Sequence, residues 1–396
     1  MSDYIYLDNA ATSPCDPRVV DLMVAALTDG CGNPSSHYTL GYSANERVST
    51  ARAQLASALN AQPNEIFFTG SGSEADNWAI KGIALALASK GKKHFITSAF
   101  EHHAVLHSMK AIEKQGFEVT YLPVTEDGFV TPESVAAAIR PDTALVSIMM
   151  ANNEIGTIQP IGEIAAVCKA AGVLMHTDAV QAVGAIPVDV KALGVDMLSL
   201  SGHKFNGPKG VGALYCRRGV HLANLIDGGG QETRRRAGTE NVAGIAGLGL
   251  AVSLATQAMA EKSAHQMVLR DYTLNRLQKN IKEVSLNGSL ANRLPGNLNI
   301  SFAGLEGETV LLDLDMQGIF ASTGSACNSD SLNSSHVILA LGKPDEVGHG
   351  SMRFSFGGQN TMQEAERLCE VLEAVIPRRR AMSCLWDHAN DTVRIF

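Results

Sequence analysis

Short apolar runs alternate with helical patterns between residues 64 and 216. The helical patterns are rich in alanine, as at residues 74–89 and 161–171. The apolar runs are EIFFTG, HFITSAF, FEVTYLPV, ALVSIMMANNE, VLMHTDAV, DMLSLSG and VGALYC. Strands that alternate with helices predict a mainly parallel sheet with helices on both faces. Because such sheets bind ligands beyond the carboxyl ends of their strands, the polar residues after each run are the candidates for chemistry.

A different pattern follows in the last third of the chain. An apolar helix is predicted near residues 242–260 and a separate amphipathic helix over about 261–281, followed by strands at GNLNISF and MRFSF and a final helix. This order is typical of a smaller α+β domain, which we expect the first dozen residues to join. The predicted fold is α/β, with a large domain at 14–260 built on a seven-stranded, mainly parallel sheet and a small domain formed by 1–13 and 261–396.

Composition excludes several classes of protein. The chain has 396 residues, of which 45% are hydrophobic and 18% charged, which is ordinary for a folded protein of two domains. A net charge of -8 argues against nucleic acid as a direct partner, because phosphates are bound by clustered lysines and arginines. The start of the chain lacks the pattern of a secretory signal, and the small and polar residues within 242–260 favour a packed helix over a membrane span. Seven cysteines without CxxC spacing indicate free thiols in the cytoplasm and no zinc site.

The segment SGHKFNGPKG places Lys204 just after an apolar run, between Ser201, His203 and several glycines. Burial of an unpaired ammonium group is costly, so a lysine at the end of a buried strand needs a specific partner.

Polar residues also follow two other predicted strands, and each of them fits more than one role. FFTGSGSEADN predicts a helix that begins near Ser73 or Glu74, where backbone N–H groups and the Ser71 and Ser73 hydroxyls suit a phosphate, although an ordinary N-cap at Ser73 has the same pattern. HTDAVQAVG gives Asp178 and Gln181. A carboxylate there can bind a metal, form a structural ion pair or balance a protonated heterocycle, and no second acid stands at metal-ligand spacing.

Three further candidates are ambiguous when each is taken alone. EHHAVL gives His102 and ANNEIG gives Asn153, and both residue types also serve as structural polar groups or turn formers. STGSACNSDSLNSSH surrounds Cys327 with small polar residues that predict a mobile loop. Such a loop suits a reactive thiol that must move between two positions, but an exposed cysteine can also lack any functional role.

Together these residues predict a site for pyridoxal phosphate. Lys204 would hold the cofactor covalently, Asp178 would keep its ring nitrogen protonated, and the turn before the helix at Ser73 would hold its phosphate.

The chain also resembles the cysteine desulfurases of the NifS and IscS type, which are pyridoxal phosphate enzymes of fold type I. The resemblance extends over nearly the whole chain, through YLDNAATSP, GNPSSH, EHHAVL, NNEIGTIQPI, HTDAVQAVG, SGHKFNGPKGVGALY, RRRAGTEN, GSAC and MRFSFG. Two pairs depart from the family pattern: Thr233 and Arg234 stand where members commonly carry Arg-Gly, and Gly358 and Gln359 where they carry Arg-Phe or a similar pair.

The resemblance implies a role for each candidate. Lys204 binds the cofactor, His102 stacks on its ring and assists proton transfer, and Arg353 binds the substrate carboxylate. The other implied contacts are Asp178 at the ring nitrogen, Gln181 at the phenolic oxygen, Gly72, Ser73, Ser201 and His203 at the phosphate, Asn153 beside cofactor and substrate, and Thr239 from a second subunit.

The implied reaction converts L-cysteine to L-alanine. Cys327 attacks the substrate sulfur as a thiolate and carries it as a persulfide to an acceptor protein, such as a scaffold for iron–sulfur clusters, or to a pathway for thio-modified nucleic acid or a sulfur-containing cofactor. The expected protein is a cytoplasmic homodimer that needs no metal. The alternatives are another reaction on the same cofactor, by a selenocysteine lyase or an aminotransferase, and a sulfur-carrier scaffold without catalysis.

Overall fold

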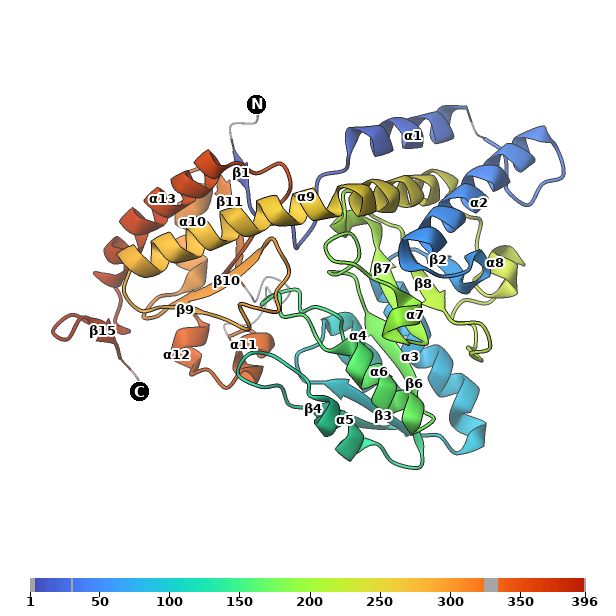
Figure 1. Cartoon of the computed structure of the whole chain (residues 1–396), viewed down its shortest axis with the longest axis horizontal. Helices are drawn as coiled ribbons and strands as arrows, with labels where there is room; N and C mark the ends of the chain where they lie inside the picture. The colour runs from blue at the N-terminus through green and yellow to red at the C-terminus, as the bar shows by residue number, and fades with distance from the viewer. Residues whose placement is uncertain (1–3, 30, 324–333, 395–396) are drawn as a thin grey trace.

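A seven-stranded sheet lies at the centre of the larger part of the molecule in the computed structural model, which describes residues 4–29, 31–323 and 334–394 (Figure 1). In spatial order its strands are β2 (Ile66–Thr69), β8 (Gly212–Cys216), β7 (Met197–Ser201), β6 (Leu174–Asp178), β5 (Thr143–Ser147), β3 (His94–Ser98) and β4 (Glu118–Leu122). Neighbouring strands are parallel except that β8 runs antiparallel to both β2 and β7. The seven apolar runs are these seven strands, and the predicted mainly parallel sheet is confirmed.

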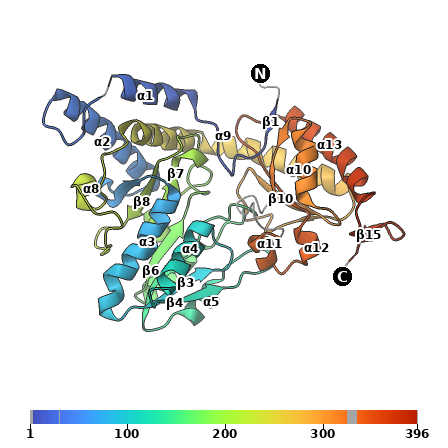
Figure 2. The same cartoon turned by 180° about the vertical axis from the view of Figure 1, so that it is seen from behind.

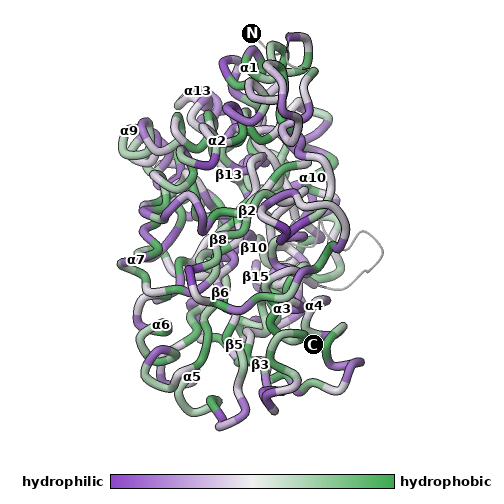
Figure 3. Tube along the Cα trace, turned by 90° about the vertical axis from the view of Figure 1, so that its right-hand side faces the viewer, coloured by the Kyte–Doolittle hydropathy of each residue, from purple (hydrophilic) through white to green (hydrophobic). Residues whose placement is uncertain are grey.

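Helices cover both faces of this sheet. The helices of this part are α1 (Pro17–Thr28), α2 (Thr39–Leu59), α3 (Gly72–Leu87), α4 (His103–Glu113), α5 (Pro132–Ala138), α6 (Ile161–Ala170), α7 (Val190–Leu193) and the short α8 (Gln231–Arg234). Successive strand residues point to opposite faces. In β3, Phe95 packs with α3 and α4, which are in front in Figure 2, and Ile96 packs with the core of α2 and α6. Two apolar faces explain why these strands are rich in hydrophobic residues, which give the green stretches near the strand labels in Figure 3.

A smaller sheet forms the core of the other part. Its strands, in order, are β12 (Ser322–Thr323), β13 (Ser351–Ser355), β10 (Asn297–Phe302) and β9 (Val284–Leu286). The accompanying helices are α10 (Gly307–Asp315), α11 (His336–Ala340), α12 (Asp345–Gly348) and α13 (Met362–Arg380), and a hairpin of β14 (Trp386–Asp387) and β15 (Thr392–Val393) ends the chain. The first residues join this part, because β1 (Ile5–Tyr6) pairs with β11 (Ile319–Phe320) and Leu7 lies in its core.

One continuous helix, α9 (Val242–Asn280), connects the two parts. The sequence pattern predicts two helices that meet near residue 260, but the structure shows no break there. Leu248 and Val252 in its first half pack into the core of the large sheet, whereas Leu269 and Leu277 in its second half pack into the small core. The change in the sequence pattern near residue 260 therefore marks the point where α9 passes from one hydrophobic core to the other. By length and composition alone α9 could cross a membrane, yet 56% of its most apolar window is buried inside the protein.

Candidate active site

A cavity of about 370 Å³ lies at the carboxyl ends of the parallel strands. Its lining comes from both parts of the molecule. The lining residues are Ala10, Ala11, Ser71, Gly72, Ser73, Asp76, His102, Met149, Asn153, Asp178, Val180, Gln181, Ser201, His203, Lys204, Thr323 and Arg353. The structure thus brings together every predicted site residue except Thr239 and Cys327.

Lys204 ends a single 3₁₀ turn that follows β7 directly. Its Nζ donates hydrogen bonds to the carbonyl oxygens of Ala10, at 2.6 Å, and Ala11, at 2.9 Å. Gln181 Nε2 donates to the same Ala10 oxygen at 3.0 Å. The N-terminal segment therefore fixes the position of the lysine from a distance of nearly 200 residues along the chain.

Asp178 is the last residue of β6 and is buried. Its Oδ1 accepts a hydrogen bond from the Val180 backbone N–H at 2.9 Å. Burial raises the pKa of Asp178 to about 6, while that hydrogen bond and Lys204 act in the opposite direction. The carboxyl group is therefore an anion at neutral pH and suits a cationic ligand.

His102 is the N-cap of α4, and its Nδ1 accepts the Ala104 N–H at 3.1 Å. Burial lowers its pKa to about 4, and the charge of Lys204 acts in the same direction. The imidazole is therefore neutral at pH 7, and the accepting role of Nδ1 assigns the proton to Nε2.

The start of α3 forms a cradle on another wall of the cavity. The helix begins at Gly72 rather than at Ser73 or Glu74, and its N-cap is Ser71, whose Oγ accepts the Glu74 N–H at 3.1 Å. A Cβ at Gly72 would lie 2.6 Å from Val180 Cγ2, so only glycine allows this close approach. Exposed N–H groups at a helix start bind phosphate.

Further phosphate candidates lie at the same place. Ser201 ends β7 and is buried, and His203 Nδ1 lies 3.2 Å from Thr12 Oγ1. Burial lowers the pKa of His203 to about 4, with Lys204 contributing in the same direction. Both side chains line the cavity, and their contact with a phosphate stays a prediction.

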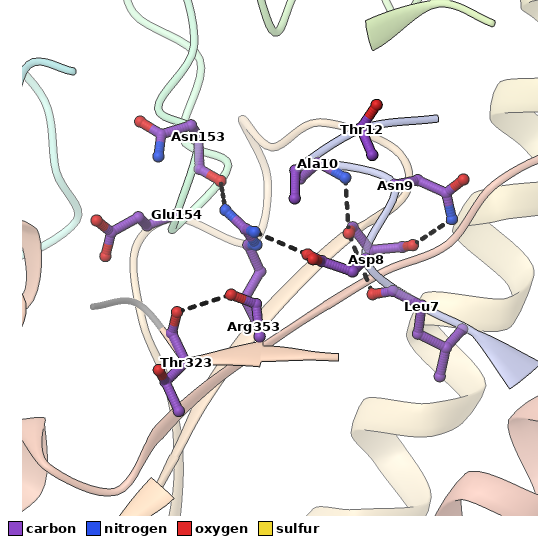
Figure 4. Close-up of polar contacts among 12 residues, drawn as sticks. Leu7, Asp8, Asn9, Ala10, Thr12, Asn153, Glu154, Thr323 and Arg353 are labelled. Carbon is purple, nitrogen blue, oxygen red and sulfur yellow. Dashed lines mark hydrogen bonds and ion pairs between the residues drawn. The ribbon is translucent and has the colours of Figure 1, made fainter. Parts of the chain in front are cut away.

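Arg353 reaches the cavity from β13 of the small sheet (Figure 4). Its Nη1 donates to the Asn153 carbonyl oxygen at 2.9 Å and its Nη2 to Asp8 Oδ1 at 2.8 Å. The residue is only 6% exposed, and its Nε has no hydrogen-bond partner among the described residues. A buried guanidinium that lines a cavity suits a carboxylate ligand.

Three acidic residues near the cavity were not singled out from the sequence. Asp8 pairs with Arg353; Asp76 lines the cavity, and Glu101 is fully buried and accepts the Met149 N–H at 3.0 Å. Burial raises the pKa of Asp76 well above its usual range and that of Glu101 to about 8. Glu101 directly precedes His102 at the end of the second apolar run, HFITSAF, so a search of strand ends for polar residues could have found both.

Two predicted residues are not in this cavity. Thr239 is exposed and lines a separate cavity of about 230 Å³ beside Gly70 and Arg236. Its predicted role is in the site of a second subunit, which a single chain does not test. Cys327 lies outside the described residues. Within residues 4–29, 31–323 and 334–394, no cluster of His, Cys, Asp or Glu is arranged to hold a metal ion.

The residues present fit pyridoxal phosphate. Lys204 offers an amine, Asp178 an anion for a protonated ring nitrogen, and His102 a neutral ring. The phosphate would lie against the backbone N–H groups at the start of α3, beside Ser73 and Ser201, which also line the cavity.

Comparisons with known proteins find relatives of the type that the sequence motifs resemble. The cysteine desulfurase IscS of Clostridium botulinum is 53% identical over 389 residues, which cover 98% of each chain. The protein of the same name from Methanosarcina thermophila is 53% identical over 381 residues, which cover 96% of this chain and 94% of that one. A solved structure of a NifS-like protein has 37% identity and a TM-score of 0.89, covering 95% of this chain and all of that one. SspA in complex with cysteine has 36% identity and a TM-score of 0.80, covering 90% of this chain and all of that one. The family described as class-V aminotransferases matches residues 5–368, and the chain belongs to this family.

Proposed function

We propose that the protein is a pyridoxal phosphate-dependent cysteine desulfurase, which converts L-cysteine to L-alanine and carries the sulfur as a persulfide on Cys327. The observation that carries the proposal is the cavity in which Lys204, Asp178 and His102 face a carboxylate-binding candidate, Arg353. The relatives named above support the reaction. The related SspA is described in complex with cysteine, which supports this amino acid as the substrate.

Each side chain has a task in this reaction. Bound pyridoxal phosphate supplies an electron sink for the negative charge that develops at the substrate Cα. Lys204 holds the cofactor at rest and, as a free amine, takes the Cα proton at its Nζ. Asp178 holds positive charge on the ring nitrogen, and neutral His102 stacks on the ring and carries a transferable proton at Nε2.

Substrate orientation and sulfur transfer use other groups. Arg353 binds the substrate carboxylate, with Asn153 beside it, and so orients the Cα–H bond toward Lys204. Cys327 must be a thiolate to attack the substrate sulfur. The bond from sulfur to the substrate carbon breaks, the persulfide forms on Cys327, and L-alanine leaves.

A homodimer is part of the proposal. Thr239 completes the phosphate site of the partner subunit in this view, which agrees with its exposure outside the cavity. An exposed apolar row on α1, Val20, Val24 and Leu27, offers a surface for the contact. Light scattering should give twice the mass of one chain, and a fully active monomer would contradict it.

The persulfide that the reaction leaves on the enzyme also indicates what kind of partner protein is needed. A persulfide must pass to a thiol of an acceptor protein, and a scaffold for iron–sulfur cluster assembly is the acceptor that we propose. The described cysteines are free thiols, which agrees with work in the reducing cytoplasm.

The test is incubation of purified, cofactor-loaded protein with L-cysteine while alanine and protein-bound persulfide are measured by mass. We expect both products in equal amounts in a single turnover. Cys327→Ala should release almost no alanine, whereas Cys384→Ala, which removes another exposed thiol, should behave as wild type. A keto acid product would identify an aminotransferase, a marked preference for selenocysteine would identify a selenocysteine lyase, and failure to bind the cofactor would identify a non-catalytic scaffold.

A further inference from the structure

Asp8 is the counter-ion of the arginine that faces the substrate. The carboxylate Oδ1 of Asp8 lies 2.8 Å from Arg353 Nη2, although the two residues are 345 positions apart in the sequence (Figure 4). The side chain of Arg353 is 7% exposed and that of Asp8 is 21% exposed. The pair therefore lies where solvent screens charges only in part.

The backbone holds Asp8 in place independently of its carboxylate. Asp8 forms a parallel bridge with Ser355 of β13, and the carbonyl oxygen of Leu7 accepts the Ser355 N–H. The carbonyl oxygen of Asp8 accepts the N–H groups of Ala11 and Thr12. Asparagine can keep all of these contacts, so the charge at position 8 can be removed without moving the segment.

Two of the three guanidinium nitrogens of Arg353 are thus already engaged. Asn153 holds Nη1 and Asp8 holds Nη2, which fixes the plane of the group, while Nε has no partner among the described residues. A carboxylate that binds this arginine comes close to the carboxylate of Asp8. Asp8 therefore fixes the guanidinium and also weakens its attraction for an anion.

We propose that Asp8 is a positioning residue that sets the affinity of the Arg353 site for the carboxylate of an amino acid. The inference rests on the proposed function, because it takes this carboxylate to be that of L-cysteine and of the product L-alanine. An arginine held in this way binds a carboxylate less tightly, but it holds the carboxylate in a fixed orientation and releases the product more readily.

The test compares two variants that remove the same charge. In Asp8→Asn an oxygen acceptor for Nη2 remains, whereas in Asp8→Ala it is lost. Calorimetry on the cofactor-loaded protein measures the dissociation constants of L-alanine and of L-alaninamide, which lacks the anionic carboxylate. Asp8→Asn should bind L-alanine about tenfold more tightly, because the repulsion between two nearby carboxylates is gone, and should bind L-alaninamide as wild type does.

The alanine variant isolates the positioning part of the role. With a guanidinium that is free to turn, Asp8→Ala should gain less affinity than Asp8→Asn and should lose about threefold in kcat, because the Cα–H bond is less well oriented. The matched control is Asp16→Asn, which removes the same charge from the N-terminal segment at a residue that pairs with the exposed Arg18 and does not line the cavity, and it should change neither dissociation constant.

Each outcome has a distinct meaning. Equal affinity of wild type and Asp8→Asn for L-alanine overturns the inference, as does an equal change for both ligands, which indicates a structural role. If neither variant folds, the carboxylate is needed for folding and the inference is also overturned. Wild-type protein that binds no L-alanine and makes none from L-cysteine contradicts the proposed function itself, whereas normal wild-type turnover with unaltered variants contradicts only the role of Asp8.

Discussion

Replacement of Arg353 by alanine should chiefly weaken the binding of L-cysteine. The arginine is 6% exposed, and it is held by Asn153 at 2.9 Å and by Asp8 at 2.8 Å beside the cavity. A forked pair with a substrate carboxylate contributes two charge-assisted hydrogen bonds, so its loss costs about 3–4 kcal/mol, or a factor of 10² to 10³ in kcat/KM. The variant also leaves Asp8 as an unpaired anion near the incoming carboxylate, which acts in the same direction.

The assay is alanine formation over a range of L-cysteine concentrations, analysed for KM and kcat separately. Arg353→Lys keeps the charge but not the planar fork, so it should recover only part of the affinity. Arg276→Ala is the control, because Arg276 pairs with Glu373 between α9 and α13, away from the cavity. A KM of Arg353→Ala within about twofold of wild type, a change worth less than 0.5 kcal/mol, would refute the assignment of the carboxylate site.

Three further changes test other parts of the structure. Lys204→Ala should abolish the visible absorption of the bound cofactor without lowering the melting temperature by more than about 3 °C, since the side chain is only half-buried, and wild-type turnover in this variant would contradict its role. Relative to wild type, Glu101→Gln should become more stable by about 3–4 kcal/mol as the pH rises from 5 to 8, because the wild-type carboxyl has a pKa of about 8 when folded and near 4.5 when unfolded, so ionisation favours the unfolded state; melting curves with a constant difference at all pH values would disprove this. Arg234→Gly should stabilise the protein by about 0.5–1 kcal/mol, because Arg234 has a left-handed φ of 65°, whereas Arg234→Ala keeps that strain and should show no gain in a denaturant titration.

The sheet and its catalytic edge follow from the sequence because they depend on local patterns. Parallel strands end at the same edge, so the polar residues after the apolar runs, such as Asp178, His102 and Lys204, come together without knowledge of any tertiary contact. Arg353 could be placed only through the resemblance, since its strand belongs to the other sheet and its neighbours carry no local motif.

Contacts made by the backbone or across the whole chain could not be predicted in this way. The carbonyl oxygens of Ala10 and Ala11 hold Lys204, but a carbonyl group is present in every residue and leaves no sequence signal. The sequence pattern predicts two helices in place of α9 because the apolar and amphipathic halves of this segment differ in composition. Helix formation needs only suitable propensity in both halves, and the difference reflects which core each half contacts.

The ambiguity of Asp178 illustrates what the structure adds to the sequence. A carboxylate at a strand end suits a metal, an ion pair or a cationic heterocycle, and the choice depends on its buried neighbours. Burial lowers the pKa of His176 to about 3 and raises that of Glu101 to about 8, so both groups are neutral at pH 7, and burial also raises the pKa of Asp76 well above its usual range. No histidine cation therefore balances the charge of Asp178, and among the described residues no cluster of His, Cys, Asp or Glu is arranged to hold a metal ion beside it. A buried carboxylate in these surroundings suits a protonated ring nitrogen better than a divalent metal, which supports the proposal that Asp178 pairs with the pyridine nitrogen of the cofactor.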